Sequence, residues 1–277
     1  MSYLAVALLL WAGSFVAGLL GSLTGLGGGV VVVPLMTLAF GIDLRYAVGA
    51  SLVSVIATSS GAAAAYVKQG YSNLRVGMFL EIATTLGALA GAYLASYLPT
   101  SWIAMIFGLV LLYSAWLSLR SRRATGPAEP DRWATRLRLD GTMPTATGHE
   151  AYHVRNVPGG FGLMFVAGVL SGLLGIGSGA VKVLAMDTVM RLPFKVSTTT
   201  SNFMIGVTAA ASAGVYLSRG YIDPGLAMPV MLGVLPGALL GTHILGGARV
   251  GALRAVFATV VAVLGIEMIY NGWTGKL

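Results

Sequence analysis

The chain of 277 residues contains no cysteine. Disulfide bonds, thiolate zinc sites and cysteine nucleophiles are therefore excluded. Charged residues are also scarce, at 9% of the chain, whereas a soluble domain carries about 25%. So few charges cannot cover a water-facing surface. With 56% hydrophobic residues and a mean hydropathy of +0.84, the composition predicts a multi-pass membrane protein.

The few charged residues are unevenly placed along the chain. Lysine and arginine outnumber aspartate and glutamate by 17 to 9, which gives a net charge of +8. Seven of the thirteen arginines fall in one polar stretch, residues 120–158. Because basic loops beside membrane spans stay on the cytoplasmic side, this placement predicts a cytoplasmic linker and argues against nucleic acid as a partner.

The chain repeats itself at an offset of 150 residues. Residues 15–91 align with 165–241 without a gap, and 23 of the 77 aligned pairs are identical. Each copy interrupts an apolar run with a glycine-rich break, at 25–29 and at 175–179. A duplicated apolar unit with a matched break in each copy is typical of secondary transporters.

The apolar runs predict an all-α integral membrane protein. A full crossing needs about 20 residues, whereas the second run of each repeat, 28–40 and 180–190, is much shorter. We therefore expect 8–10 transmembrane segments in two tandem repeats, 1–119 and 159–277, each with a glycine-broken, half-length helix.

Basic residues also predict the relative orientation of the repeats. With the linker inside, counting spans places the 41–45 loop outside and the equivalent 191–195 loop, which holds Arg191 and Lys195, inside. Equivalent loops that swap sides indicate inverted repeats with an odd number of crossings each. Parallel repeats with an even number of crossings are the alternative.

The two breaks are candidate binding sites. Gly27, Gly28 and Gly29 end the first break, and Gly177, Ser178 and Gly179 end the second. Glycine disfavours helix. Backbone groups outside a helix are tolerated within a membrane only where they are buried in protein or line a water-filled cavity. The helix start after each break could hold an anion. Alternatively, the glycines only permit close helix packing.

Hydroxyl and amide side chains follow both breaks. Ser51 lies after the first break, and Thr200, Ser201 and Asn202 lie after the second. Such groups can replace an anion's hydration shell without adding charge, so we include them in the predicted site. Hydrogen bonding between helices is the alternative role.

Lys182 is the one basic residue that the sequence places inside a span close to a break. Its ammonium would add a full positive charge to an anion site. The alternatives are an ion pair with Asp187 or an ammonium that reaches the membrane surface. Glu81 lies six residues after Arg75, so we expect it at the membrane interface.

The linker contains one pattern that indicates a different chemistry. His149, Glu150 and His153 match the H-E-x-x-H motif, which binds zinc when it lies on a helix. Here it lies among prolines and has no evident third ligand, so we interpret it as a coincidence and predict no metal and no cofactor.

Four segments together resemble the TauE/SafE family of membrane permeases. They are 25–35 (GLGGGVVVVPL), 49–52 (GASL), 175–183 (GIGSGAVKV) and 200–208 (TSNFMIGVT). The sequence departs from the family pattern at Ser178, where a third glycine is usual, and at Leu184, where the first copy has proline. The resemblance implies a plasma-membrane carrier of two repeats that moves small anions, with sulfite and sulfonates as the best attested.

The sequence thus predicts a secondary transporter, not an enzyme, that moves a small oxyanion by alternating access. Sulfite or an organosulfonate is the expected substrate. A membrane-embedded zinc metalloprotease built on His149, Glu150 and His153, or a passive anion channel, is the alternative. The expected partners are the anion and the lipid bilayer, and a homodimer is left open.

Overall fold

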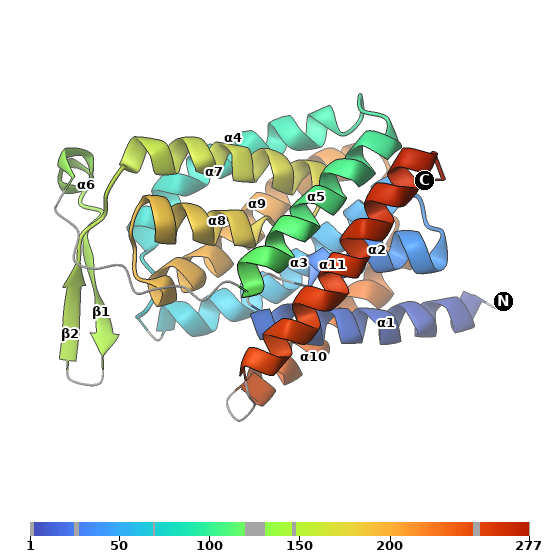
Figure 1. Cartoon of the computed structure of the whole chain (residues 1–277), viewed down its shortest axis with the longest axis horizontal. Helices are drawn as coiled ribbons and strands as arrows, with labels where there is room; N and C mark the ends of the chain where they lie inside the picture. The colour runs from blue at the N-terminus through green and yellow to red at the C-terminus, as the bar shows by residue number, and fades with distance from the viewer. Residues whose placement is uncertain are drawn as a thin grey trace.

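The computed structural model describes residues 3–24, 28–68, 70–119, 131–145, 148–245 and 250–276 (Figure 1). The first half contains α1 (Tyr3–Thr24), α2 (Gly29–Pro34), the π-helical turn η1 (Leu35–Ala39), α3 (Leu44–Lys68), α4 (Leu74–Leu94) and α5 (Thr100–Leu119). The second half contains α7 (Val157–Leu174), α8 (Gly179–Leu184), η2 (Ala185–Val189), α9 (Phe194–Ser218), α10 (Pro224–Leu245) and α11 (Val250–Thr274). The predicted all-α membrane fold is confirmed.

The helices of the two halves begin at the same offset of 150 residues that relates the sequences. Gly29 begins α2 and Gly179 begins α8, and Leu44 begins α3 where Phe194 begins α9. Gly70 and Gly220, which follow α3 and α9, have φ of +74° and +75°. An L side chain rarely adopts this conformation, so the paired glycines end equivalent helices in the same way.

Each half begins with a helical hairpin. In the first half α1 is followed by α2 and η1, and in the second α7 is followed by α8 and η2. The backbone N–H of Arg155, just before α7, donates to the carbonyl of Met190, just after η2, at 2.9 Å. The second hairpin therefore enters and leaves at one end of the bundle, and Figure 1 shows the first hairpin doing so at the other end.

Three long helices follow each hairpin and run along the bundle. A chain that leaves a hairpin at one end and then makes three passes finishes at the other end. The second half therefore starts at the end opposite to the first, and equivalent loops of the two halves lie at opposite ends. At one end, Arg45 beside the 41–43 loop donates to the Leu98 carbonyl at 3.2 Å. At the other, Asn73 donates to the Leu139 carbonyl at 2.9 Å. This is the arrangement that inverted repeats require, while the membrane side that each end faces stays a prediction.

The two halves interlock through helix pairs. The largest interfaces join α1 to α10, α4 to α7, α5 to α11 and α3 to α9, and every pair takes one helix from each half. A Cβ atom on Gly87 would lie 2.2 Å from the Phe165 carbonyl oxygen, and one on Gly237 would lie 2.1 Å from the Phe15 oxygen. These matched glycines let the backbones approach as small residues do in membranes.

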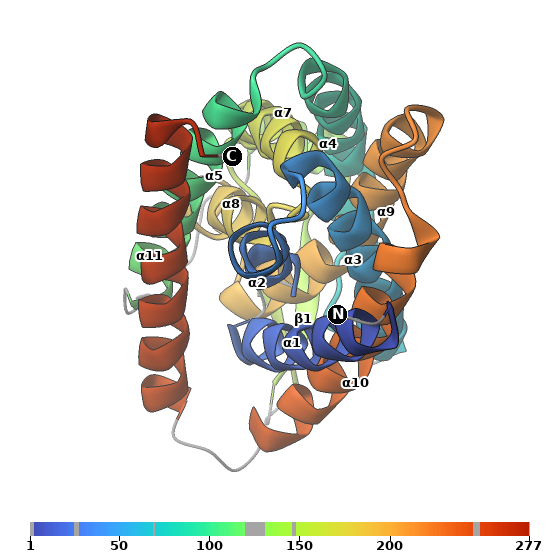
Figure 2. The same ribbon diagram turned by 90° about the vertical axis from the view of Figure 1, so that its right-hand side faces the viewer.

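The short helices α2 and α8 lie in the middle of the bundle, with the long helices around them (Figure 2). Residues of α2 and α3 form much of the larger buried cluster. The outer faces carry exposed apolar side chains such as Leu109, Ile82 and Ile266. By length and composition alone, α4, α5, α7 and the Ala255–Thr274 part of α11 can each cross a membrane.

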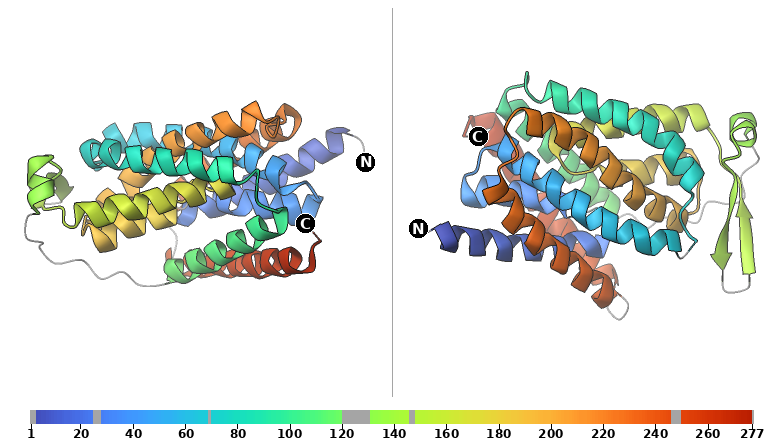
Figure 3. Two further views of the ribbon diagram at one scale, coloured as in Figure 1. Left: turned by 90° about the horizontal axis from the view of Figure 1, so that it is seen from above. Right: turned by 180° about the vertical axis from the view of Figure 1, so that it is seen from behind.

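The predicted linker contains structure of its own. It holds the short helix α6 (Arg132–Arg136) and an antiparallel hairpin of β1 (Gly141–Thr145) and β2 (Gly148–Tyr152), at the end of the bundle away from the termini (Figure 3). Asp131 caps α6 by accepting from the Trp133 N–H, and Asp140 accepts from the Val154 N–H. These local bonds fold the segment, and a pattern of apolar residues does not reveal them. The helix α7 begins at Val157.

Candidate functional site

The structure brings the second glycine break against the first half. The Ser51 hydroxyl on α3 donates to the Gly175 carbonyl oxygen at 2.9 Å. A Cβ atom on Gly29, at the start of α2, would lie 2.7 Å from Ser51 Oγ and 3.2 Å from that same oxygen. Gly28, Gly29, Ser51 and Gly175 are all buried. Gly27 lies outside the described residues.

The second break is built from left-handed backbone. Gly175, Gly177 and Ser178 have φ of +67°, +69° and +44°. The counterpart of Ser178 in the first half is Gly28, which has φ of −64°. The two breaks therefore differ in backbone shape at Ser178, the position where the sequence departs from the family pattern. The Ser178 hydroxyl donates to the Ala167 carbonyl on α7 at 2.5 Å, which ties the break to the preceding helix.

The predicted polar residues of α9 separate into two groups. Ser201 is buried, and its hydroxyl lies 3.5 Å from the Gly179 carbonyl oxygen, at the break. Asn202 is its half-buried neighbour. Thr200 instead accepts a hydrogen bond from the Asn73 N–H at 3.0 Å, which fastens α9 to the start of α4 at the end of the bundle. The structure therefore does not bring Thr200 to the breaks.

Lys182 on α8 is completely buried, with 0% of its surface exposed. Its ammonium Nζ donates to the Thr208 hydroxyl on α9 at 2.5 Å. Thr208 in turn donates to Glu81 Oε1 on α4 at 2.7 Å. Lys182 is thus linked to Glu81 through Thr208, whereas an ion pair with Asp187 was one of the alternatives that the sequence left open.

Glu81, which we expected at the membrane interface, is buried by protein. Its exposed fraction is only 8%, because the face of α4 that carries it packs against α7 and α9. Thr85 on the same helix also donates to Glu81 Oε1, at 3.2 Å. The other oxygen, Oε2, is buried without a hydrogen-bond partner in the described part of the chain.

A cavity of about 430 Å³ adjoins Glu81 between α4 and α9. Glu81 and Thr85 are the polar residues of its wall, and the rest of the wall is apolar, formed by Met78, Ile82, Leu86, Phe203 and Val207. Met78, Ile82 and Val207 are among the exposed apolar side chains of the outer face. Glu81 is therefore a carboxylate at the inner wall of an apolar, outward-facing groove.

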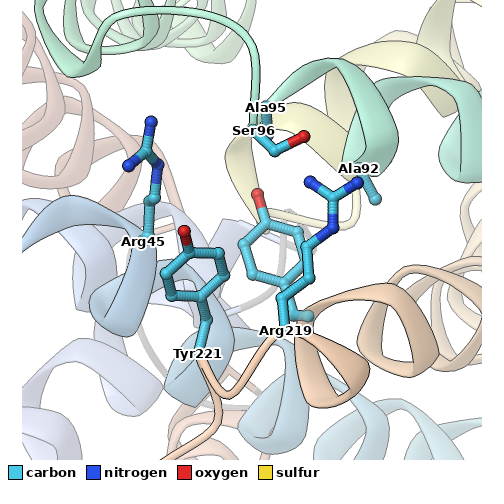
Figure 4. Close-up of a pocket in the computed structure, with 7 residues that line it drawn as sticks. Arg45, Ala92, Ala95, Ser96, Arg219 and Tyr221 are labelled. Atoms are coloured by element: carbon cyan, nitrogen blue, oxygen red, sulfur yellow. The ribbon is translucent and has the colours of Figure 1, made fainter.

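A second polar cluster lies where α3, α4 and α9 meet at one end of the bundle (Figure 4). Arg45 and Arg219 flank a narrow crevice that Tyr216 and Tyr221 also line. The guanidinium carbon of Arg45 lies 5.8 Å from the Tyr221 ring centre. Arg45 Nε and one terminal nitrogen of Arg219 are buried without a hydrogen-bond partner among the described residues.

The opposite end carries an equivalent pair. Lys195 and Tyr71 are the counterparts of Arg45 and Tyr221 at the 150-residue offset, and Lys195 Nζ lies 3.7 Å from the Tyr71 ring centre. The duplicated Gly-Tyr pairs at 70–71 and 220–221 therefore present a cation over a tyrosine at each end.

The H-E-x-x-H motif does not lie on a helix. His149 and Glu150 are exposed on β2, and His153 follows the strand with its Nδ1 3.5 Å from Asp140 Oδ2. A helix is what places both imidazoles on one face around zinc, and the strand removes that geometry. Within the described residues, no group of three His, Asp or Glu side chains is placed to hold a metal ion.

The helical bundle, its apolar outer faces and its central broken helices define a multi-pass membrane transporter. The family model described as "Sulfite exporter TauE/SafE" matches residues 10–268. The chain therefore belongs to the TauE/SafE family, and it is a transporter rather than an enzyme.

Curated relatives carry names of the same class. The chain is 29% identical over 265 residues to "Probable membrane transporter protein YunE" of Bacillus subtilis, covering 93% of this chain and 95% of the relative. It is 26% identical over 258 residues to "Probable membrane transporter protein YdhB" of the same organism, covering 92% and 97%. A "Probable membrane transporter protein" of Xylella fastidiosa is 25% identical over 262 residues, covering 94% and 92%. No solved structure matches the chain significantly.

Proposed function

We propose that the protein is a secondary transporter that moves a small oxyanion across the plasma membrane by alternating access, with the linker on the cytoplasmic side. Sulfite or an organosulfonate is the substrate class that we favour, in keeping with the description of the family model. The anion would bind where the two glycine breaks adjoin, midway along the bundle.

The observation that carries this proposal is the complete burial of Lys182 three residues beyond the second break. A buried ammonium is costly in a membrane protein and therefore marks a functional position. An anion beside Lys182 would receive a charge-assisted hydrogen bond. We include in the same site the hydroxyls of Ser51 and Ser201 and the backbone of Gly28, Gly29, Gly177 and Gly179, which belong to the adjoining breaks.

Two further features support an anion as the substrate. The Arg45–Arg219 cluster at one end and Lys195 at the other place positive charge at both approaches to the centre. Charge of one sign at an entrance raises the local concentration of oppositely charged substrates. The short helix α2 packs against α1 and α3 of its own half and against α11 of the other half, and Ser51 on α3 bonds the second break. These contacts between the halves relate the site to rearrangement of one half against the other.

The test begins with the purified protein and a thermal-shift panel of sulfite, sulfate, thiosulfate, methanesulfonate and acetate. An anion present at 100 times its dissociation constant should stabilise the protein by about 2.7 kcal/mol. If none of the panel shifts the melting temperature and none enters proteoliposomes, the proposed substrate class is wrong.

Substitution of Lys182 then locates the site. Lys182→Gln should weaken binding of the stabilising anion by roughly 1.5–3 kcal/mol, since a buried charge-assisted contact is lost. Lys276→Gln is the matched control, because Lys276 is exposed at the end of the chain. Equal affinity in the two variants would remove Lys182 from the site.

Imposed gradients separate the carrier from a passive anion channel. A carrier shows counterflow, in which unlabelled anion trapped inside the vesicle drives labelled anion inward, because both compete for one alternating site. A channel conducts in proportion to the electrochemical gradient and shows no such exchange. Absence of counterflow together with a steady conductance would favour the channel.

A further inference from the structure

Three side chains from three helices form a linear chain of hydrogen bonds beside the breaks. The Lys182 ammonium donates to Thr208 at 2.5 Å, and Thr208 donates to Glu81 Oε1 at 2.7 Å. The direction is fixed by chemistry, because an ammonium can only donate and a carboxylate can only accept. The Thr208 hydroxyl lies between the two opposite charges.

The arrangement exists in one half of the molecule only. The counterpart of Thr208 in the first repeat is Thr58, whose hydroxyl donates to backbone carbonyls of its own helix. The counterparts of Glu81 and Lys182 are Met231 and Val32, which carry no charge. The interlocked fold does not require the chain of hydrogen bonds, so stability of the repeat architecture does not explain it.

The titratable groups around Glu81 are few. The adjoining helix α7 contains none. On α9 they are Lys195 and Tyr216, which belong to the clusters at the two ends of the bundle, and on α4 they are Arg75 and Tyr93 near the helix ends. Asp187 lies in η2, beyond Lys182. Within the described part of the chain, Lys182 is the charged group linked to Glu81, through Thr208.

We propose that Glu81 binds the proton that couples transport, so that the protein moves one proton together with its anion. The proposal rests on the proposed function, with Lys182 as the anion's contact. Its geometric basis is the buried carboxylate linked to Lys182, whose Oε2 is buried without a hydrogen-bond partner among the described residues, on a residue that lines a cavity of about 430 Å³. An unpartnered carboxylate oxygen is where a proton can be accepted.

Coupling follows from charge balance. While Glu81 is ionised, it compensates Lys182 through Thr208, and an incoming anion must compete with that compensation. A proton on Glu81 removes the negative charge and leaves the buried ammonium uncompensated, which favours an anion beside it. Thr208 can then donate to the Met204 carbonyl, which lies 2.8 Å from its oxygen. By linkage, the anion in turn favours protonation of Glu81.

The first test follows protons and anions together in proteoliposomes loaded with a pH-sensitive dye. Methanesulfonate is the probe, because it stays ionised near neutral pH and carries no proton itself. The wild-type protein should acidify the lumen in step with methanesulfonate uptake. In Glu81→Gln, which resembles the protonated acid, proton movement should disappear while methanesulfonate counterflow persists. Glu267→Gln is the control, because Glu267 is exposed on α11.

The second test measures methanesulfonate affinity in detergent as a function of pH. In the pH range where Glu81 is ionised in the free protein, the affinity for methanesulfonate should fall roughly tenfold for each unit that the pH rises, as expected for one linked proton. In Glu81→Gln the affinity should not vary with pH below the range where Lys182 deprotonates. A wild-type pH dependence in this variant would assign the proton to Lys182 and overturn the proposal.

A third measurement does not depend on any substrate. Infrared difference spectra between acid and alkaline pH should contain a protonated-carboxyl band that Glu81→Gln abolishes and Glu267→Gln retains. An unchanged band in Glu81→Gln overturns the proposal even if no anion is transported. The opposite combination is also informative. If Glu81→Gln loses the band while the wild type transports no methanesulfonate, sulfite or thiosulfate, Glu81 is still the proton site and the anion-carrier function is rejected.

Discussion

The Ser51 hydroxyl donates a hydrogen bond to the carbonyl oxygen of Gly175, which lies 124 residues later in the chain. The bond joins α3 of the first half to the break of the second half. Gly175 is buried and follows the last residue of α7, so its carbonyl has left the regular helix. Because water is excluded there, this side chain replaces the partner that a continuous helix would have provided.

Ser51→Ala should therefore destabilise the protein by about 1–3 kcal/mol, the cost of leaving a buried acceptor unsatisfied. Thermal unfolding in detergent measures the change. Ser60→Ala is the matched control, because Ser60 is exposed on the same helix and donates only to the Ile56 carbonyl of that helix. If both variants unfold alike, Ser51 does not stabilise the break.

The architecture could be predicted from the sequence because it depends on features that a single chain displays. The internal repeat gave equivalent helices, and the glycine breaks gave the short helices that begin at Gly29 and Gly179. The hairpin of the linker was not predicted. It depends on side-chain bonds such as those of Asp131 and Asp140, which apolar periodicity does not reveal.

Gly29→Ala should destabilise the adjoining breaks by roughly 1–3 kcal/mol, the usual cost of overpacking. The added methyl would lie 2.7 Å from Ser51 Oγ, 2.8 Å from Val55 Cγ2 and 3.2 Å from the Gly175 carbonyl oxygen, so these neighbours would have to shift. Unfolding temperature and anion uptake are the measurements.

Gly162→Ala provides the comparison for Gly29. Gly162 lies within α7, and a methyl group there would meet nothing within 4 Å. Removing this exposed helical glycine should be neutral or should stabilise by up to about 1 kcal/mol. If Gly29→Ala is as stable as Gly162→Ala, the packing around Gly29 has room for a methyl group and the prediction is wrong.

The site was only partly predictable, for a specific reason. Lys182 was found because its charge interrupts an apolar run beside a break. Glu81 was assigned to the interface from its distance to Arg75 along α4, yet its hydrogen-bond partner Thr208 is 127 residues away. Only the packing of α4 on α9 brings them together. Thr58 and Thr208 are equivalent positions of the two repeats, which drew attention to Thr208. Nothing in the sequence identified Glu81 as its partner.

Labelling of single cysteines tests the inverted topology against a background that has no cysteine. Asp43→Cys and Phe194→Cys lie at the starts of equivalent helices, and both positions are exposed. The structure puts the two starts at opposite ends of the bundle, so an impermeant maleimide should label Asp43→Cys in intact cells and Phe194→Cys only after the membrane is opened. Labelling of both from one side would contradict inverted repeats.

The Arg45–Arg219 cluster should act on the rate of anion entry rather than on the central affinity. Arg219→Gln is expected to lower the initial rate of uptake several-fold at low ionic strength, and to do so less at high salt, because screening weakens electrostatic steering. Arg45 also donates to the Leu98 carbonyl, so Arg219 is the cleaner position to change.

Arg136→Gln is the control for Arg219, because Arg136 is an exposed arginine of α6 at the opposite end of the bundle. Initial rates should be compared with the dissociation constant obtained from thermal shifts, which depends on the central site. If Arg219→Gln weakens equilibrium binding as much as Lys182→Gln does, the cluster is part of the binding site itself. The effect of Arg219→Gln on the rate could instead be independent of salt and equal to that of Arg136→Gln. In that case the two buried, unpartnered guanidinium nitrogens have no part in attracting the anion. The role of Arg219 is then to stack on Tyr93, whose ring centre lies 5.0 Å from its guanidinium carbon.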